Sequence, residues 1–167
     1  MKDFIIKVAE RFVSIISYIF PFIEICYYFG AKVFLSTDSV SMKLFYLNYI
    51  DKIALFYNAN IYIIFIAMVG IFIVCSRGTL PLTKFVRFNV IQAILLNIIC
   101  SCIGSIFSFL PVIIRESMIG LLLSNFFFLG TILLMLYSFL LIFYGRYPRI
   151  PVLSEAARLQ VQRGFSG

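Results

Sequence analysis

Glu24 is the one acidic side chain that lies inside a long apolar stretch of this chain, and it follows Pro21 by three residues. A carboxylate at the centre of a membrane-spanning helix costs about 2.5–3.5 kcal/mol, so a residue of this kind needs a reason to be there. One interpretation is a functional site. The other is a buried glutamate that is protonated or hydrogen-bonded and is held by the side-chain amide of Gln92 or Asn97. The sequence leaves both interpretations open.

A second group of small and polar side chains recurs every four residues between positions 89 and 105. On an α-helix this spacing gives one narrow, tilted strip among Ile, Leu and Phe side chains. Such a strip favours packing between membrane helices, and the lining of a hydrated path is the alternative. Ala93 belongs to the strip, and the candidates for helix packing or path lining are Glu24, Asn89, Gln92, Asn97, Ser101 and Ser105.

The sequence lacks the residue patterns that catalysis, phosphate binding or metal binding would require. The chain has no histidine, no close pair of carboxylates within an apolar stretch, no nucleophile motif and no glycine-rich phosphate loop. Its four cysteines lie in or beside apolar runs without a C-x-x-C pair, which is typical of small buried side chains. We therefore expect no enzyme, no catalytic residue, no metal site and no cofactor.

Four apolar stretches must position these side chains, at about 12–35, 57–75, 86–109 and 121–144. About 20 apolar residues suffice for a helix to cross a bilayer. The chain is 63% hydrophobic and 13% charged, with a mean hydropathy of +1.08, whereas a soluble domain carries about 25% charged residues. The sequence predicts an all-α integral membrane protein, a single domain over 1–167 with four transmembrane helices and a basic tail at 145–167.

Three local patterns refine this prediction. Pro21 predicts a kink or break near the centre of the first span. The segment 36–60 mixes apolar and charged residues in a way that favours a helix lying in the membrane interface, and a helix running straight on into Ile61 is the alternative. In the fourth span, Ser124, Thr131, Ser138 and Gly145 are seven residues apart, which predicts a packing seam.

Basic residues are concentrated on alternate sides of the spans. The N-terminal flank, the loop between the second and third spans, and the tail carry ten of the 14 Lys and Arg residues. This distribution indicates membrane orientation rather than nucleic-acid binding, and with an even number of spans it places both termini on the same, positively charged side.

Two stretches, 86–96 and 145–157, resemble the signature segments of the twenty-kilodalton membrane subunit family of the Tic translocon, in its plastid-encoded or cyanobacterial-type form. The residues that match the family's motifs are Arg87, Phe88, Asn89, Gln92, Ala93, Tyr147, Pro148, Arg149, Pro151, Glu155 and Ala156. The resemblance implies a four-helix protein of the chloroplast inner envelope with both termini in the stroma. It assigns no catalytic role to any of these residues.

The resemblance also implies a function in protein import. We expect a translocon subunit that contributes to, or scaffolds, a path for preproteins, and that works in a hetero-oligomer with other inner-envelope subunits, preproteins in transit and the lipid bilayer as its partners. The alternative is a small-molecule or ion transporter or channel of the plastid or cyanobacterial membrane. That alternative calls for internal repeats and several ionisable groups at the midplane, where this sequence offers one.

Overall fold

The computed structural model describes residues 2–163, and across these residues the chain is helical with no strand. The first crossing is α1 (Lys2–Ile16), α2 (Ile19–Ile25), a π-helical turn η1 (Cys26–Gly30) and α3 (Ala31–Leu35). Together Ile5–Leu35 are long and apolar enough to span a membrane. The break at Ser17 and Tyr18 lies one turn before Pro21, which has no N–H to donate to the Ser17 carbonyl. The predicted kink or break is therefore confirmed as a break between α1 and α2.

The second crossing is broken. A continuous helical segment of α4 (Val40–Phe45), η2 (Tyr46–Ile50) and α5 (Asp51–Ala59) meets α6 (Ile61–Arg77) at an angle of 79°. This bend at Asn60 excludes a straight helix, and residues 57–59 of the predicted 57–75 span belong to α5. Three segments are each long and apolar enough to cross a membrane, and the bent pair is a fourth if it is counted as one span. The interfacial position of 40–59 stays a prediction.

The third and fourth crossings are single helices, α7 (Lys84–Phe109) and α9 (Met118–Phe143), joined by the short α8 (Val112–Arg115). Each begins at a hydroxyl N-cap: Thr83 Oγ1 accepts from the Val86 N–H, and Ser117 Oγ accepts from the Gly120 N–H. After α9, the chain turns back and forms α10 (Leu153–Arg163).

The seam predicted on α9 is confirmed for three of its four residues. Ser124, Thr131 and Ser138 are buried against the rest of the bundle, whereas most side chains on the opposite side of α9 are exposed. Gly145 does not belong to the seam, because α9 ends at Phe143. Gly145 has a φ of +69° and lies in the turn that leads away from the helix.

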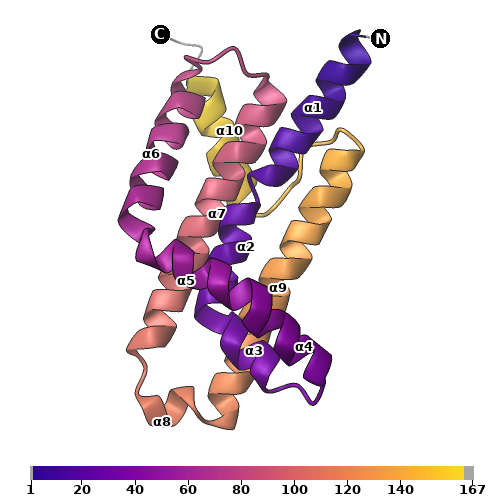
Figure 1. Ribbon diagram of the computed structural model, residues 1–167. Helices are drawn as coiled ribbons and strands as arrows, with labels where there is room; N and C mark the ends of the chain where they lie inside the picture. The colour runs from indigo at the N-terminus through magenta and orange to yellow at the C-terminus, as the bar shows by residue number, and fades with distance from the viewer. Residues whose placement is uncertain (1, 164–167) are drawn as a thin grey trace.

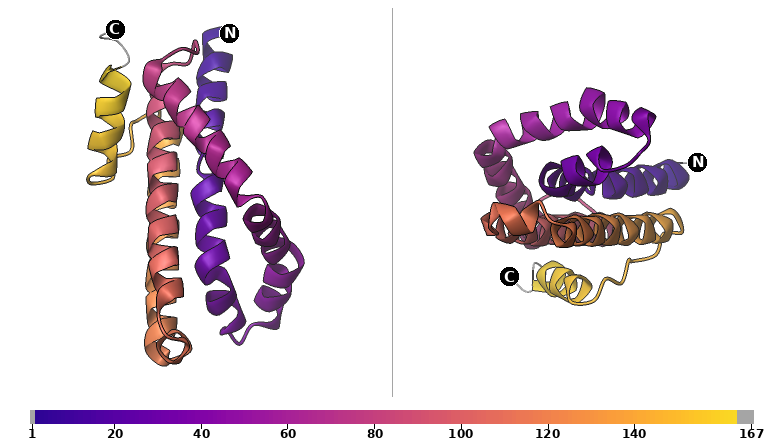
Figure 2. Two further views of the ribbon diagram at one scale, coloured as in Figure 1. Left: turned by 90° about the vertical axis from the view of Figure 1, so that its left-hand side faces the viewer. Right: turned by 90° about the horizontal axis from the view of Figure 1, so that it is seen from below.

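The helices form layers around a core beside α2, η1 and α7 (Figures 1 and 2). Seen from below, α7 and α9 form one row, α1–α3 lie against it, α4–α6 wrap the outside of α1–α3, and α10 covers the opposite face of α7 (Figure 2). The outer side chains of α6, such as Ile63, Ile66 and Val69, are exposed, as expected for a surface that faces lipid.

Helix α1 begins and α10 ends at the same end of the bundle, beside the connection from α6 to α7 (Figure 1). Most basic residues belong to segments at this end, which we call the basic end: Lys7, Arg11, Arg77, Lys84, Arg87, Arg146, Arg149 and Arg158. The side chains of Lys2 and Arg163, and residues 1 and 164–167 of the predicted domain and tail, lie outside the described residues.

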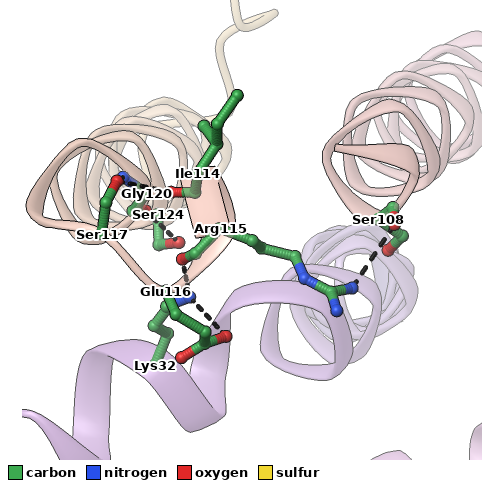
Figure 3. Close-up of polar contacts among 8 residues, drawn as sticks. All are labelled: Lys32, Ser108, Ile114, Arg115, Glu116, Ser117, Gly120 and Ser124. Atoms are coloured by element: carbon green, nitrogen blue, oxygen red, sulfur yellow. Dashed lines mark hydrogen bonds and ion pairs between the residues drawn. The ribbon is translucent and has the colours of Figure 1, made fainter. Parts of the chain in front are cut away.

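The opposite end is held by polar contacts between α3 and the connection around α8 (Figure 3). Lys32 Nζ donates to the Arg115 carbonyl oxygen and forms an ion pair with Glu116 at 3.0 Å. The same amino group lies 5.8 Å from the centre of the Phe107 ring. These contacts tie the first crossing to the hairpin that joins α7 to α9.

Two glycines on α9 give a matched test of this packing. A Cβ on Gly120 would overlap the Arg115 carbonyl, whereas a Cβ on Gly130 meets nothing within 4 Å. We expect Gly120→Ala to lower the free energy of unfolding by about 1–3 kcal/mol through overpacking. Gly130→Ala should leave it unchanged or raise it by up to about 1 kcal/mol through helix propensity. Unfolding in mixed micelles, followed by circular dichroism, measures both, and an equal effect of the two substitutions would contradict the α8–α9 geometry.

Candidate functional site

A cavity of about 520 Å³ lies beside the bend between α5 and α6, bounded by α2, α5, α6 and α7. Its volume is within the range of ligand-binding pockets, roughly 300–1,000 Å³. Most of its wall is apolar, and five side chains with hydroxyl, amide or carboxyl groups contribute to it from four helices. The lining residues are Glu24, Tyr57, Ile61, Tyr62, Phe65, Met68, Asn97, Ile98, Ser101 and Cys102.

The polar side of this cavity is buried and incompletely paired. Glu24 and Asn97 are 1% and 2% exposed, and Glu24 Oε2 and Asn97 Oδ1 have no hydrogen-bond donor. The Tyr57 hydroxyl faces both side chains. A buried acceptor without a donor costs about 1–3 kcal/mol, so the fold tolerates a local loss of stability at this place.

The structure distinguishes between the two amides that the sequence offered to Glu24. Asn97 shares the cavity with Glu24, whereas Gln92 does not line it. The two amides are five residues apart on α7, which is about 140° around the helix and about 7.5 Å along it. Gln92 instead faces the hydroxyl of Tyr18, which in turn faces Ser138 on α9.

The remaining strip residues lie between helices. Asn89 is buried, and its Nδ2 donates to the Phe85 carbonyl one turn earlier. Ala93 is buried in the core. Ser105 lies 3.1 Å from the Tyr28 hydroxyl, beside Gly104, whose missing side chain makes room for the Tyr28 ring. The residues of the strip thus lie in two environments. Most of them pack between helices, whereas Asn97 and Ser101 line the cavity.

Arg87 organises the basic end. The residue is 2% exposed, and its guanidinium donates from Nε to the Cys75 carbonyl at 2.6 Å and from Nη2 to the Ser76 carbonyl at 2.9 Å. These carbonyls belong to the last turn of α6, where helical acceptors lack a partner and a positive charge is favourable. Ser76 Oγ in turn donates to Gln160 on α10 at 3.1 Å. Arg87 therefore joins the end of α6 to the start of α7, with α10 beside them.

The two signature stretches of the sequence meet in this region. The Tyr147 ring packs edge-on against the rings of Phe85 and Phe88, with centroids 5.3 and 5.1 Å away. On α10, residues at helical spacing face α7 and α6: Leu153, Ala157 and Val161 are buried. Of the other motif residues in the second stretch, Pro148 is buried, Ala156 is half-buried, and Arg149, Pro151 and Glu155 are exposed.

Two tyrosines were missed by the sequence analysis. Tyr18 lies at the break in the first crossing, and Tyr57 lies one turn before the bend at Asn60. The available signal was a hydroxyl in an apolar segment, which must find a polar neighbour when it is buried. Which neighbour it finds depends on the two breaks in the helices. Within residues 2–163 no three or more His, Cys, Asp or Glu side chains are grouped as metal ligands.

The family described as the chloroplast import apparatus Tic20-like matches residues 8–157. The Tic20 family protein Ycf60 of Porphyra purpurea is 33% identical over 157 residues, 93% of this chain and 77% of that protein. Ycf60 of Gracilaria tenuistipitata var. liui is 32% identical over 159 residues, with the same coverage. A Tic20 family protein of Synechocystis sp. is 29% identical over 154 residues, 92% of this chain and 93% of that protein. No solved structure matches the chain.

The contacts of Arg87 predict a large effect for a side chain near the end of a helix. Arg87→Met keeps the apolar volume but leaves the Cys75 and Ser76 carbonyls without these donors, so we expect the free energy of unfolding to fall by about 2–4 kcal/mol. The matched control is Arg158→Met on the exposed side of α10, which should change it by less than about 0.5 kcal/mol. Unfolding in mixed micelles measures both variants. Equal stability of Arg87→Met and the wild type would contradict the assigned role.

Proposed function

The chain belongs to the Tic20-like family of the chloroplast import apparatus, and on that premise we propose that it is a subunit of a preprotein import translocon in the inner envelope membrane of a plastid. The observation that carries the proposal is the family match over residues 8–157, which covers nearly all of the apolar segments. The relatives and these apolar helices indicate a plastid or cyanobacterial membrane protein; the inner envelope is the finer step that we propose.

The packing of the bundle supports a role shared with other subunits. Large buried side chains such as Tyr18, Phe29 and Ile91 fill the space between the crossings, so a path wide enough for a polypeptide would need further protein around it. We propose that this chain contributes one wall of such a path, or scaffolds it, within a hetero-oligomer of inner-envelope subunits. The polar surface available to a preprotein is the cavity beside Glu24, Asn97 and Ser101. The proposal assigns no catalytic residue.

The orientation that we propose places the basic end in the stroma. Both the start of α1 and the end of α10 lie at that end (Figure 1), and the excess of Lys and Arg there is what the positive-inside rule associates with the side on which the chain is made. The end that carries Lys32, Arg115 and Glu116 would then face the space between the two envelope membranes.

Orientation can be tested with tags on both termini. In intact plastids whose outer envelope has been made permeable, protease should leave both tags protected, and both should be digested once the inner envelope is opened. Cleavage of one tag alone would mean that the termini lie in different compartments, which would overturn the four-crossing arrangement. A tag inserted between α3 and α4, at the opposite end, is the matched control and should be digested before the inner envelope is opened.

The function itself is tested by isolating the tagged chain from plastids in which a preprotein has been arrested during import. We expect the arrested preprotein and other inner-envelope subunits to co-purify, and a version of the preprotein without its targeting segment to be absent. The purified chain in lipid vesicles provides the second measurement. Selective flux of a small solute or ion, together with failure to co-purify with the preprotein, would favour the transporter alternative and contradict the proposal.

A further inference from the structure

The cavity beside the α5–α6 bend carries a specific chemical deficit. Two oxygen atoms, Glu24 Oε2 and Asn97 Oδ1, belong to lining residues that are almost fully buried, and neither receives a hydrogen bond. The Tyr57 hydroxyl lies close to both side chains, but its single O–H can donate to only one of them at a time. The rest of the wall is mostly apolar, with Phe65, Met68 and Ile98 from α6 and α7. The matching ligand therefore combines an apolar body with hydrogen-bond donors.

The depth of the cavity restricts which molecules meet this description. Asn97 lies at the middle of α7, thirteen residues after Lys84 and twelve before Phe109. In a bilayer of about 30 Å of hydrocarbon, this level holds acyl chains, and the polar groups of lipids lie at its edges. A lipid therefore supplies no donor at this depth.

A polypeptide supplies a hydrogen-bond donor, the backbone N–H, with every residue except proline. In a helix the backbone N–H groups are already bonded within the helix, but in an extended segment they are not, and leaving one unbonded in hydrocarbon costs several kcal/mol. The N–H groups of an extended chain are therefore the donors that the two acceptors of the cavity lack. From this complementarity we propose that the cavity binds an extended apolar segment of a polypeptide in transit, whose backbone N–H groups donate to Glu24 and Asn97.

This inference rests on the proposed function and names the form in which the substrate occupies the site. The apolar wall receives the side chains, and the two acceptors receive the backbone, so recognition does not depend on the sequence of the segment. A protein that handles many different preproteins needs this property. Side-chain-independent recognition of an extended chain through main-chain hydrogen bonds is a general mode of peptide binding.

Photocrosslinking measures occupancy of the cavity. A photoreactive phenylalanine derivative replaces Phe65 or Ile98 in the wall, and in the control it replaces Leu133, an exposed residue on α9 that does not line this cavity. The probe is a preprotein arrested during import in intact plastids. We expect adducts with the preprotein from the two wall positions and adducts with lipid from the control position.

The role of the acceptors is tested by removing one of them without creating a hole. Asn97→Leu should lower the yield of preprotein adduct from position 65 by about threefold to tenfold, the effect of losing one hydrogen bond. The matched control is Tyr18→Phe, which also removes a buried polar atom without a hydrogen bond but lies outside the cavity. Its adduct yield should equal that of the wild type. Because both variants remove an unsatisfied polar group, neither should unfold more easily, and unfolding in mixed micelles checks this.

The role of the backbone N–H groups is tested by changing the preprotein. Placing prolines in the arrested segment removes backbone N–H groups, and it should lower the adduct yield from position 65 when alanines at the same places do not. If neither the prolines nor Asn97→Leu changes the adduct yield from position 65, the proposal is overturned. It is also overturned if the wall positions crosslink only to lipid. If the preprotein still co-purifies in those cases, the import function stands and only this binding mode fails. If no preprotein co-purifies at all, the proposed function fails and the inference falls with it.

Discussion

The hydrocarbon of a membrane offers no hydrogen-bond partner, and this constraint governs where every polar group of the chain lies. Backbone groups are paired within helices, and side chains such as Ser124 and Asn89 donate to carbonyls of their own helix. Arg87 follows the same rule at a helix end, where it donates to carbonyls that α6 leaves unpaired. Among the described residues, buried side-chain atoms without a hydrogen bond belong to Tyr18, Glu24, Asn89, Gln92 and Asn97. Of these, Glu24 and Asn97 line the cavity beside the α5–α6 bend.

Small residues allow the polar side chains to be turned inward. Gly104 lets the Tyr28 ring pack directly on α7, which brings the hydroxyl of Tyr28 to Ser105. Gly120 lets the start of α9 pack against the carbonyl of Arg115. Polar pairing between helices thus depends on the close approach that glycine allows. A hydrogen bond between two membrane helices requires backbones near enough for short side chains to meet.

Much of this fold could be predicted from local sequence, because a membrane span, a proline kink and a seven-residue seam are each properties of a single segment. The bend of 79° at Asn60 could not. Nothing at Asn60 forbids a helix, and the direction of α6 is set by its contacts with α7 and α10, which are distant in sequence. For the same reason the site was predicted in part: Glu24 and Asn97 stand out by residue type, whereas Tyr57 acquires its role only because α5 ends beside them.

The two ends of α7 differ in how firmly they are held, and the difference follows from what covers them. Near the basic end, α10 and the end of α6 bury the first signature stretch, and Arg87 and Tyr147 join these segments. Farther along α7, α6 has bent away, so Asn97 and Ser101 face a cavity instead of a helix. The bend between α5 and α6 thus leaves α6 shorter than the other candidate spans and places a cavity with Glu24, Asn97 and Ser101 in its wall beside α7.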